Sequence, residues 1–195
     1  MKSENTVSLG GMHISIFLSG EEQKKGTLII PKLVHGAHIV TVLSGTEDVS
    51  GCDAVLTEKH MLSLGVRTAD CAPICFSDGK TIGIAHVGWR GLCLGLIEKM
   101  QEHFDAGTLA VYVAPFLHSF EIQKDFCYDQ ITQKFGERFI EGKEGKLIFH
   151  FMEAIMSLVP PQTVYDTRDT ATDLSLPSYR RGHMAERLVT TVSFA

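Results

Sequence analysis

The sequence predicts an α/β fold, a layered structure in which a mixed β-sheet core is flanked by helices. Two apolar runs of β-forming residues, 72–76 and 81–85, are separated by Ser77-Asp78-Gly79-Lys80, whose Asp-Gly pair is a strong hairpin signal. After this hairpin, apolar residues recur at roughly helical spacing over 92–104, 125–139 and 147–159. An alternation of strand-like and helix-like segments fits helices packed on a sheet.

The other strand-like segments are short, apolar and spread along the chain. The glycine pair Gly10-Gly11 interrupts the first of them, and a polar turn over 20–25 follows it. β-branched residues dominate the last, which closes the chain. We expect strand structure over 7–17, 27–30, 53–57, 61–68, 109–114, 164–167 and 187–194.

The overall composition fits one domain over residues 1–195. The chain has 195 residues with 44% hydrophobic content, enough for a sizeable core, and no Pro/Ser/Gly-rich linker divides it. Its net charge of −5 is spread without long runs of one sign. Nucleic-acid binding needs a basic stripe, so the charge pattern argues against it.

Neither a membrane segment nor an export signal is expected. No apolar run approaches the length that spans a bilayer, and the first twelve residues contain no secretory apolar region. The five cysteines are an odd number without paired spacing, which argues against disulfides: they are Cys52, Cys71, Cys75, Cys93 and Cys127. The sequence therefore predicts a cytoplasmic protein.

Two chemically active residues lie at the ends of the predicted hairpin. Cys71 precedes its first strand and His86 follows its second, so antiparallel pairing brings the two side by side. The glycine-framed turn 87–91 comes next and leads into the first predicted helix. A helix N-terminus beside a Cys/His pair suits an anion or a thiolate. Simple core packing of the cysteine is the alternative reading.

A second histidine interrupts an apolar run upstream, where His35 is followed by Gly36 in the segment 31–40. His35, Cys71 and His86 together with an open fourth position form a plausible catalytic zinc set, whereas structural zinc has four protein ligands. The spacing is not that of a zinc finger.

Five short motifs carry a family resemblance. They are VHG at 34–36, CDAVLT at 52–57, RTADCAPICFSD at 67–78, AHVGWRG at 85–91 and SYRRGHMAERL at 178–188. In this order they resemble the YfiH-like family, also called the polyphenol-oxidase or laccase-domain family. The match is dense over 32–94 and thin over the last two dozen residues.

The resemblance implies a site and an activity. It implies that His35, Cys71 and His86 hold one divalent metal, usually zinc, with copper as the less favoured ion. It implies phosphorolysis of purine nucleosides or deamination of adenosine, with a nucleoside and phosphate as the small-molecule partners. Some bacterial members are also linked to peptidoglycan editing. The same layered α/β fold is implied.

Asp70 and Arg90 are further candidates for the catalytic set. Asp70, directly before Cys71, could act as a general base or support a ligand histidine through a hydrogen bond. Arg90 could bind a phosphate or substrate oxygen with two hydrogen bonds. A structural salt bridge from Arg90 to Asp70 or Asp78 is the slightly favoured alternative.

Three other functions compete with the zinc enzyme. A copper polyphenol oxidase needs many clustered imidazoles, but the nine histidines are scattered and contain no His-x-His pair. A metal-free, amidase-like hydrolase would use Cys71 as a nucleophile activated by His86. An inactive metal-binding module would bind the ion without turnover. Metal dependence and turnover of inosine or adenosine separate these hypotheses.

Overall fold

The structure is a computed structural model that describes residues 5–20 and 27–195. The predicted polar turn over 20–25 lies almost wholly outside the described residues. None of the helices within these two ranges is long and apolar enough to cross a membrane.

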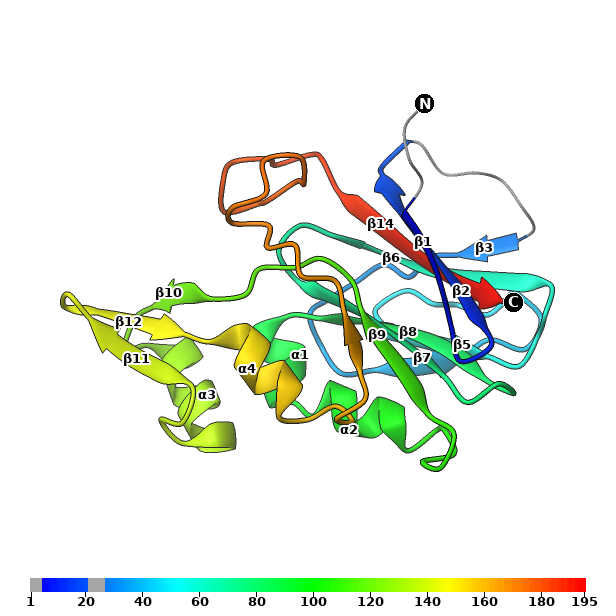
Figure 1. Ribbon diagram of the computed structural model, residues 1–195, viewed down its shortest axis with the longest axis horizontal. Helices are drawn as coiled ribbons and strands as arrows, with labels where there is room; N and C mark the ends of the chain where they lie inside the picture. The colour runs from blue at the N-terminus through cyan, green and yellow to red at the C-terminus, as the bar shows by residue number, and fades with distance from the viewer. Residues whose placement is uncertain (1–4, 21–26) are drawn as a thin grey trace.

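In the described part of the chain, three β-sheets form the framework (Figure 1). The six-stranded sheet runs in the order β13 (Val164–Tyr165), β9 (Ala110–Val113), β7 (Ala72–Ser77), β8 (Ile82–Val87), β5 (Ala54–Thr57) and β4 (Ile39–Thr41). The five-stranded sheet runs β1 (Asn5–Leu9), β2 (Met12–Leu18), β14 (Leu188–Phe194), β6 (Leu62–Thr68) and β3 (Thr27–Ile29). The three-stranded sheet runs β10 (Phe120–Ile122), β12 (Lys146–Phe149) and β11 (Ile140–Lys143).

The six-stranded sheet is mixed, and its inner strands β5, β7 and β8 are buried on both faces. Its outer pairs, β13 with β9 and β4 with β5, are parallel, while the pairs between them are antiparallel. In β7, Ile74 and Phe76 pack into the core on the helical side, whereas Cys75 packs into the core shared with the five-stranded sheet. Burial on both faces explains why β7 and β8 read as continuous apolar runs. The mixed sheet flanked by helices confirms the predicted α/β class.

The predicted hairpin is confirmed as β7 and β8. Ala72 pairs with Val87 and Pro73 pairs with His86. At the turn, the Asp78 carboxylate accepts hydrogen bonds from the backbone N–H groups of Lys80 and Thr81 at 3.0 and 2.7 Å. The hairpin therefore carries its two strand ends, with Cys71 and His86, to the same edge of the sheet.

The helices are shorter than the sequence pattern predicts. They are α1 (Trp89–Cys93), α2 (Leu96–Gln101), α3 (Phe126–Phe135) and α4 (Phe151–Met156). The single helix expected over 92–104 is interrupted at Gly95, whose φ of 78° is left-handed and cannot continue an α-helix. The helix expected over 147–159 was wrong at its start, because residues 147–149 belong to β12 and pair with both β10 and β11.

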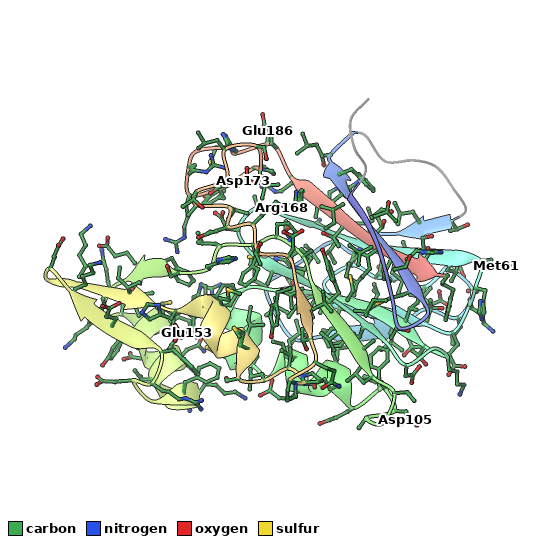
Figure 2. The ribbon with its side chains drawn as sticks, in the orientation of Figure 1. Met61, Asp105, Glu153, Arg168, Asp173 and Glu186 are labelled. Atoms are coloured by element: carbon green, nitrogen blue, oxygen red, sulfur yellow. The ribbon has the colours of Figure 1, made fainter. Side chains whose placement is uncertain are left out.

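Phe76 tests the core that supports the hairpin. Its side chain is fully buried, and its ring stacks on Phe104 with centroids 5.7 Å apart. We expect Phe76→Ala to lower the free energy of unfolding by about 3–5 kcal/mol, because a large cavity replaces the ring. Urea denaturation measures the change. Met61, which is 78% exposed at the edge of the molecule (Figure 2), provides the control, and Met61→Ala should change stability by less than about 0.5 kcal/mol. Equal effects of the two substitutions would contradict this account of the core.

Candidate active site

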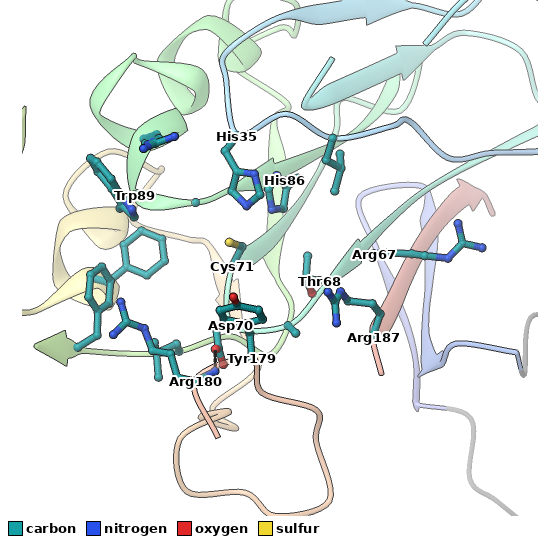
Figure 3. Close-up of a pocket in the computed structure, with 17 residues that line it drawn as sticks. His35, Arg67, Thr68, Asp70, Cys71, His86, Trp89, Tyr179, Arg180 and Arg187 are labelled. Carbon is teal, nitrogen blue, oxygen red and sulfur yellow. Dashed lines mark hydrogen bonds between the residues drawn. The ribbon is translucent and has the colours of Figure 1, made fainter. Parts of the chain in front are cut away.

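The structure brings His35, Cys71 and His86 together from three separate segments. Their ligand atoms all lie within 4.8 Å of one another. His86 belongs to β8, Cys71 directly precedes β7, and His35 lies in the loop between β3 and β4. Among the described residues, no other group of three or more His, Cys, Asp or Glu side chains converges in this way. Figure 3 shows the two imidazoles and the thiol facing one another at the centre of a pocket.

A buried aspartate, which sequence reasoning missed, holds both histidines. Asp53 is fully buried, and its Oδ1 lies 2.9 Å from Nδ1 of His86. The same carboxylate accepts hydrogen bonds from the backbone N–H groups of His35, at 2.8 Å, and Gly36, at 2.6 Å. When Nδ1 of His86 donates to Asp53, Nε2 is left as the atom able to bind a metal. The signal was present in the CDAVLT motif, but nothing in it identifies the partners.

The charges of this cluster are coupled. Burial opposes ionisation of Asp53, but its hydrogen bonds from His86 and the two backbone N–H groups hold its pKa below the usual value. Burial likewise favours the neutral thiol of Cys71, yet His35 and His86 lower its pKa to about 7. Burial works against protonation of His86, while Asp53 and Cys71 raise its pKa. The thiolate is the form of cysteine that binds metals and attacks as a nucleophile.

Two backbone features pack the cluster tightly. His35 has a left-handed backbone with φ of 61°, which is uncommon outside glycine, and its N–H bond to Asp53 holds it there. Gly88 follows β8 at the point where the chain passes the site. A Cβ at this position would lie 3.2 Å from Sγ of Cys71 and 3.4 Å from Cδ2 of His35. A larger residue would therefore crowd the two donors.

The Asp70 carboxylate forms its hydrogen bonds with the 166–187 loop and not with His35, Cys71 or His86. Its Oδ1 accepts a hydrogen bond from Oγ1 of Thr170 at 2.7 Å, and its Oδ2 accepts one from the backbone N–H of Arg180 at 2.9 Å. Both partners belong to the 166–187 loop, which connects β13 to β14. Asp70 therefore fastens this loop beside Cys71, with a left-handed backbone of its own (φ 87°).

The salt bridge favoured for Arg90 is absent among the described residues. Both oxygens of Asp70 are occupied by Thr170 and Arg180, and the Asp78 carboxylate binds backbone N–H groups at the far end of the hairpin. The guanidinium of Arg90 instead lies 5.2 Å from the centroid of the Trp89 ring. Arg90 is thus available to the pocket.

The pocket around the cluster has a volume of about 780 Å³, within the range of small-molecule sites. Apolar and aromatic side chains form one part of its wall, including Trp89, Leu117, Phe120 and Phe151. His35, Cys71, His86, Asp70 and Arg90 all line it, so every site residue expected from the sequence opens onto one cavity. Tyr179 and Arg180 add a wall from the 166–187 loop.

The sequence matches one family model and is similar to proteins of known name. A family model described as multi-copper polyphenol oxidoreductase laccase matches residues 16–194. The chain is 30% identical over 178 residues to a purine nucleoside phosphorylase of Aquifex aeolicus, covering 86% of this chain and 83% of that protein. These matches confirm the resemblance to the YfiH-like family.

Solved structures share the fold at low identity. The Neisseria meningitidis protein NMB0706 superposes with a TM-score of 0.82 at 18% identity, covering 99% of each chain. The protein YfiH of Bacillus licheniformis superposes with a TM-score of 0.76 at 20% identity, covering 89% of this chain and 76% of that one. At such identities the likeness extends to the fold alone.

Asp53→Asn tests how the two histidines are held. An amide offers one acceptor oxygen in place of two, so it cannot serve His86 and both backbone N–H groups. We expect the affinity for a divalent ion to fall by about 10- to 100-fold, as measured by competition with a chelating dye. Asp78→Asn is the matched control, because Asp78 also binds backbone N–H groups but at the far turn. An unchanged affinity in Asp53→Asn would contradict the role given to Asp53.

Thr170→Val tests the attachment of the 166–187 loop. Valine keeps the shape but removes the donor to Asp70, leaving a buried carboxylate oxygen unsatisfied at a cost of about 1–3 kcal/mol. Amide hydrogen exchange over 178–181 should become faster, while Thr170→Ser, which keeps the hydroxyl, should behave like the unmodified protein. Equal exchange in the valine and serine variants would rule out this attachment.

Proposed function

The chain belongs to the family described as multi-copper polyphenol oxidoreductase laccase, and from this premise we propose that it is a zinc-dependent enzyme acting on purine nucleosides. The reaction proposed is phosphorolysis of inosine or adenosine. The observation that carries the proposal is the convergence of His35, Cys71 and His86 at the floor of a nucleoside-sized pocket. The names of relatives, such as the Aquifex aeolicus purine nucleoside phosphorylase, point to the same substrates.

The three side chains fit a divalent ion. Two imidazoles and a thiolate are the donor types that zinc accepts, and three protein ligands leave a position open, as in catalytic sites. Asp53 fixes the tautomer of His86, as an outer carboxylate does for ligand histidines. When bound, such an ion supplies Lewis-acid chemistry, which polarises oxygen atoms and lowers the pKa of water.

The pocket wall suits a purine nucleoside. Trp89, Phe120 and Phe151 line the pocket, and the half-buried Trp89 offers ring surface on which a flat purine can pack. The 166–187 loop, held by Asp70, adds Tyr179 to the lining of the pocket. In phosphorolysis a phosphate oxygen forms the bond to C1′ of the ribose as the bond from C1′ to the base nitrogen breaks. The base leaves with that electron pair and takes up a proton. The residues of the wall hold the two reactants in line.

Adenosine deamination is a second candidate at the same site. The open position beside His35, Cys71 and His86 favours it, because attack of water on the purine is the step such a position assists. No phosphate is consumed in that reaction, and ammonia leaves. Product analysis of adenosine with and without phosphate therefore separates it from phosphorolysis.

A metal-free hydrolase is the strongest competitor. Cys71, His86 and Asp53 are arranged like the nucleophile, the base and the orienting acid of a catalytic triad. Nδ1 of His86 lies 2.9 Å from Oδ1 of Asp53. His35 argues against a metal-free hydrolase, because a metal site uses a second imidazole beside the thiol and a catalytic triad does not need one. Multicopper oxidation is disfavoured because the described residues gather into only one such donor group. A binding module without turnover is the remaining alternative.

Metal content and turnover test the proposal together. We expect purified protein to contain about one zinc ion per chain and to release hypoxanthine from inosine only when phosphate is present. A strong chelator should abolish the release and added zinc should restore it, since the ligands are exposed to the pocket. Elemental analysis and product chromatography are the measurements. Full activity after complete removal of metal would favour the Cys71 hydrolase instead.

Cys71→Ser and His86→Ala should each remove tight zinc binding and turnover while the protein stays folded. The core of a chain this long does not depend on the ion, so cooperative thermal unfolding should persist. Cys93→Ser is the matched control, because Cys93 is partly buried but does not line the pocket. Turnover that survives His86→Ala would place the reaction elsewhere, and a metal-loaded protein without turnover would favour the binding module.

A further inference from the structure

Arginine side chains gather in the pocket of a chain whose net charge is −5. Of its seven arginines, four line the pocket, and none of the described lysines does: these four are Arg67, Arg90, Arg180 and Arg187. Asp70 is the one carboxylate among the described lining residues, and Thr170 and the Arg180 backbone already occupy both of its oxygens. The pocket therefore carries positive charge on an acidic protein.

The four arginines fall into two groups. Arg67 and Arg187 lie on the opposite side of Cys71 from Trp89 and Arg180 (Figure 3). Arg187 is committed to the chain itself, because its Nη1 donates to three backbone carbonyl groups, those of His183, Met184 and Glu186. The Arg187 side chain therefore stabilises the backbone of its own loop.

Among the residues that the structure describes, neither Arg90 nor Arg180 has a comparable partner. The guanidinium of Arg90 lies 5.2 Å from the centroid of the Trp89 ring and 6.0 Å from that of Phe126, and the guanidinium of Arg180 lies 4.4 Å from the centroid of Phe120. A cation–π contact with a ring pairs the charge without occupying the five N–H donors of a guanidinium through an acceptor atom, so these donors remain for another group. Neither guanidinium is paired with a carboxylate among residues 5–20 and 27–195.

The two side chains come from different elements and both line the pocket. Arg90 belongs to α1, and Arg180 belongs to the 166–187 loop, where Asp70 holds its backbone N–H. Burial and Asp125 raise the pKa of the Cys127 thiol to about 11, while Arg180 and Arg90 both act in the opposite direction. Both guanidinium groups therefore lie within electrostatic range of the same thiol. An anion that enters this part of the pocket is attracted by both charges.

We propose that Arg90 and Arg180 form a phosphate-binding subsite at the Trp89 end of the pocket. Arginine matches the geometry of phosphate, because its fork of donors binds two oxygens at once. The choice of phosphate as the anion rests on the proposed function, whereas the anion site itself rests on the two guanidinium groups. The phosphate is either the inorganic co-substrate or the phosphate group of a nucleotide.

Equilibrium binding to the protein, with zinc and after chelation, tests the subsite independently of turnover. The probes are inorganic phosphate and inosine 5′-monophosphate, with inosine as the uncharged reference, followed by calorimetry. We expect Arg90→Met and Arg180→Met each to weaken phosphate binding by about tenfold or more, with and without zinc, as for loss of a charge-assisted hydrogen bond. The affinity for inosine should change by less than about threefold.

Arg138→Met is the matched control, because the Arg138 guanidinium also lies over a phenyl ring, 4.8 Å from the centroid of Phe139, but does not line the pocket. It should bind both probes normally. Loss of the nucleotide alone in the two variants assigns the subsite to a substrate phosphate, and loss of inorganic phosphate assigns it to the co-substrate. The proposal would be overturned if the unmodified protein did not bind phosphate, or if both variants bound both anions normally. It would also be overturned if the variants bound inosine more weakly and the anions normally. Phosphate binding without nucleoside turnover would leave the subsite standing and refute the proposed phosphorolysis.

Discussion

The carboxylate of Asp53 is the contact on which the candidate site depends. Asp53 directly precedes β5 and is fully buried, and its side chain adds hydrogen bonds to the His35 loop and to β8 beyond those of the backbone. Its bonds to two backbone N–H groups hold the loop of His35 in a left-handed conformation, and its bond to His86 turns that ring toward Cys71. Burial of a charge is costly without such partners, so the carboxylate and its donors specify each other.

Sequence reasoning succeeded where structure is local. Two apolar runs and an Asp-Gly turn predict the hairpin of β7 and β8, and the pairing of these strands brings Cys71 toward His86. It failed at two places. Residues 147–149 have helical spacing, yet they form β12, which pairs with β11 across the Glu144-Gly145 turn and with the more distant β10. Asp53 was missed because its partners lie 17 to 33 residues away and no local pattern predicts them.

The family description and the site differ in what they suggest. A multicopper centre requires several groups of ligands, but the described part of the chain offers one, formed by His35, Cys71 and His86. The three donors also lie in a cavity lined by aromatic rings and arginines, which suits ligand binding better than electron transfer. Chemistry at this site is therefore governed by what the pocket admits beside the three donors.

The position of β14 has a consequence for how the protein is made. This strand lies in the middle of the five-stranded sheet, between β2 and β6, although it is the last strand in the sequence (Figure 1). While a ribosome synthesises the chain, the facing edges of β2 and β6 emerge early and stay unpaired until residue 194 has been added. Open strand edges are templates for pairing with other chains. The nascent protein thus passes through a period in which its own final strand competes with its neighbours' strands, and slow translation would lengthen that period.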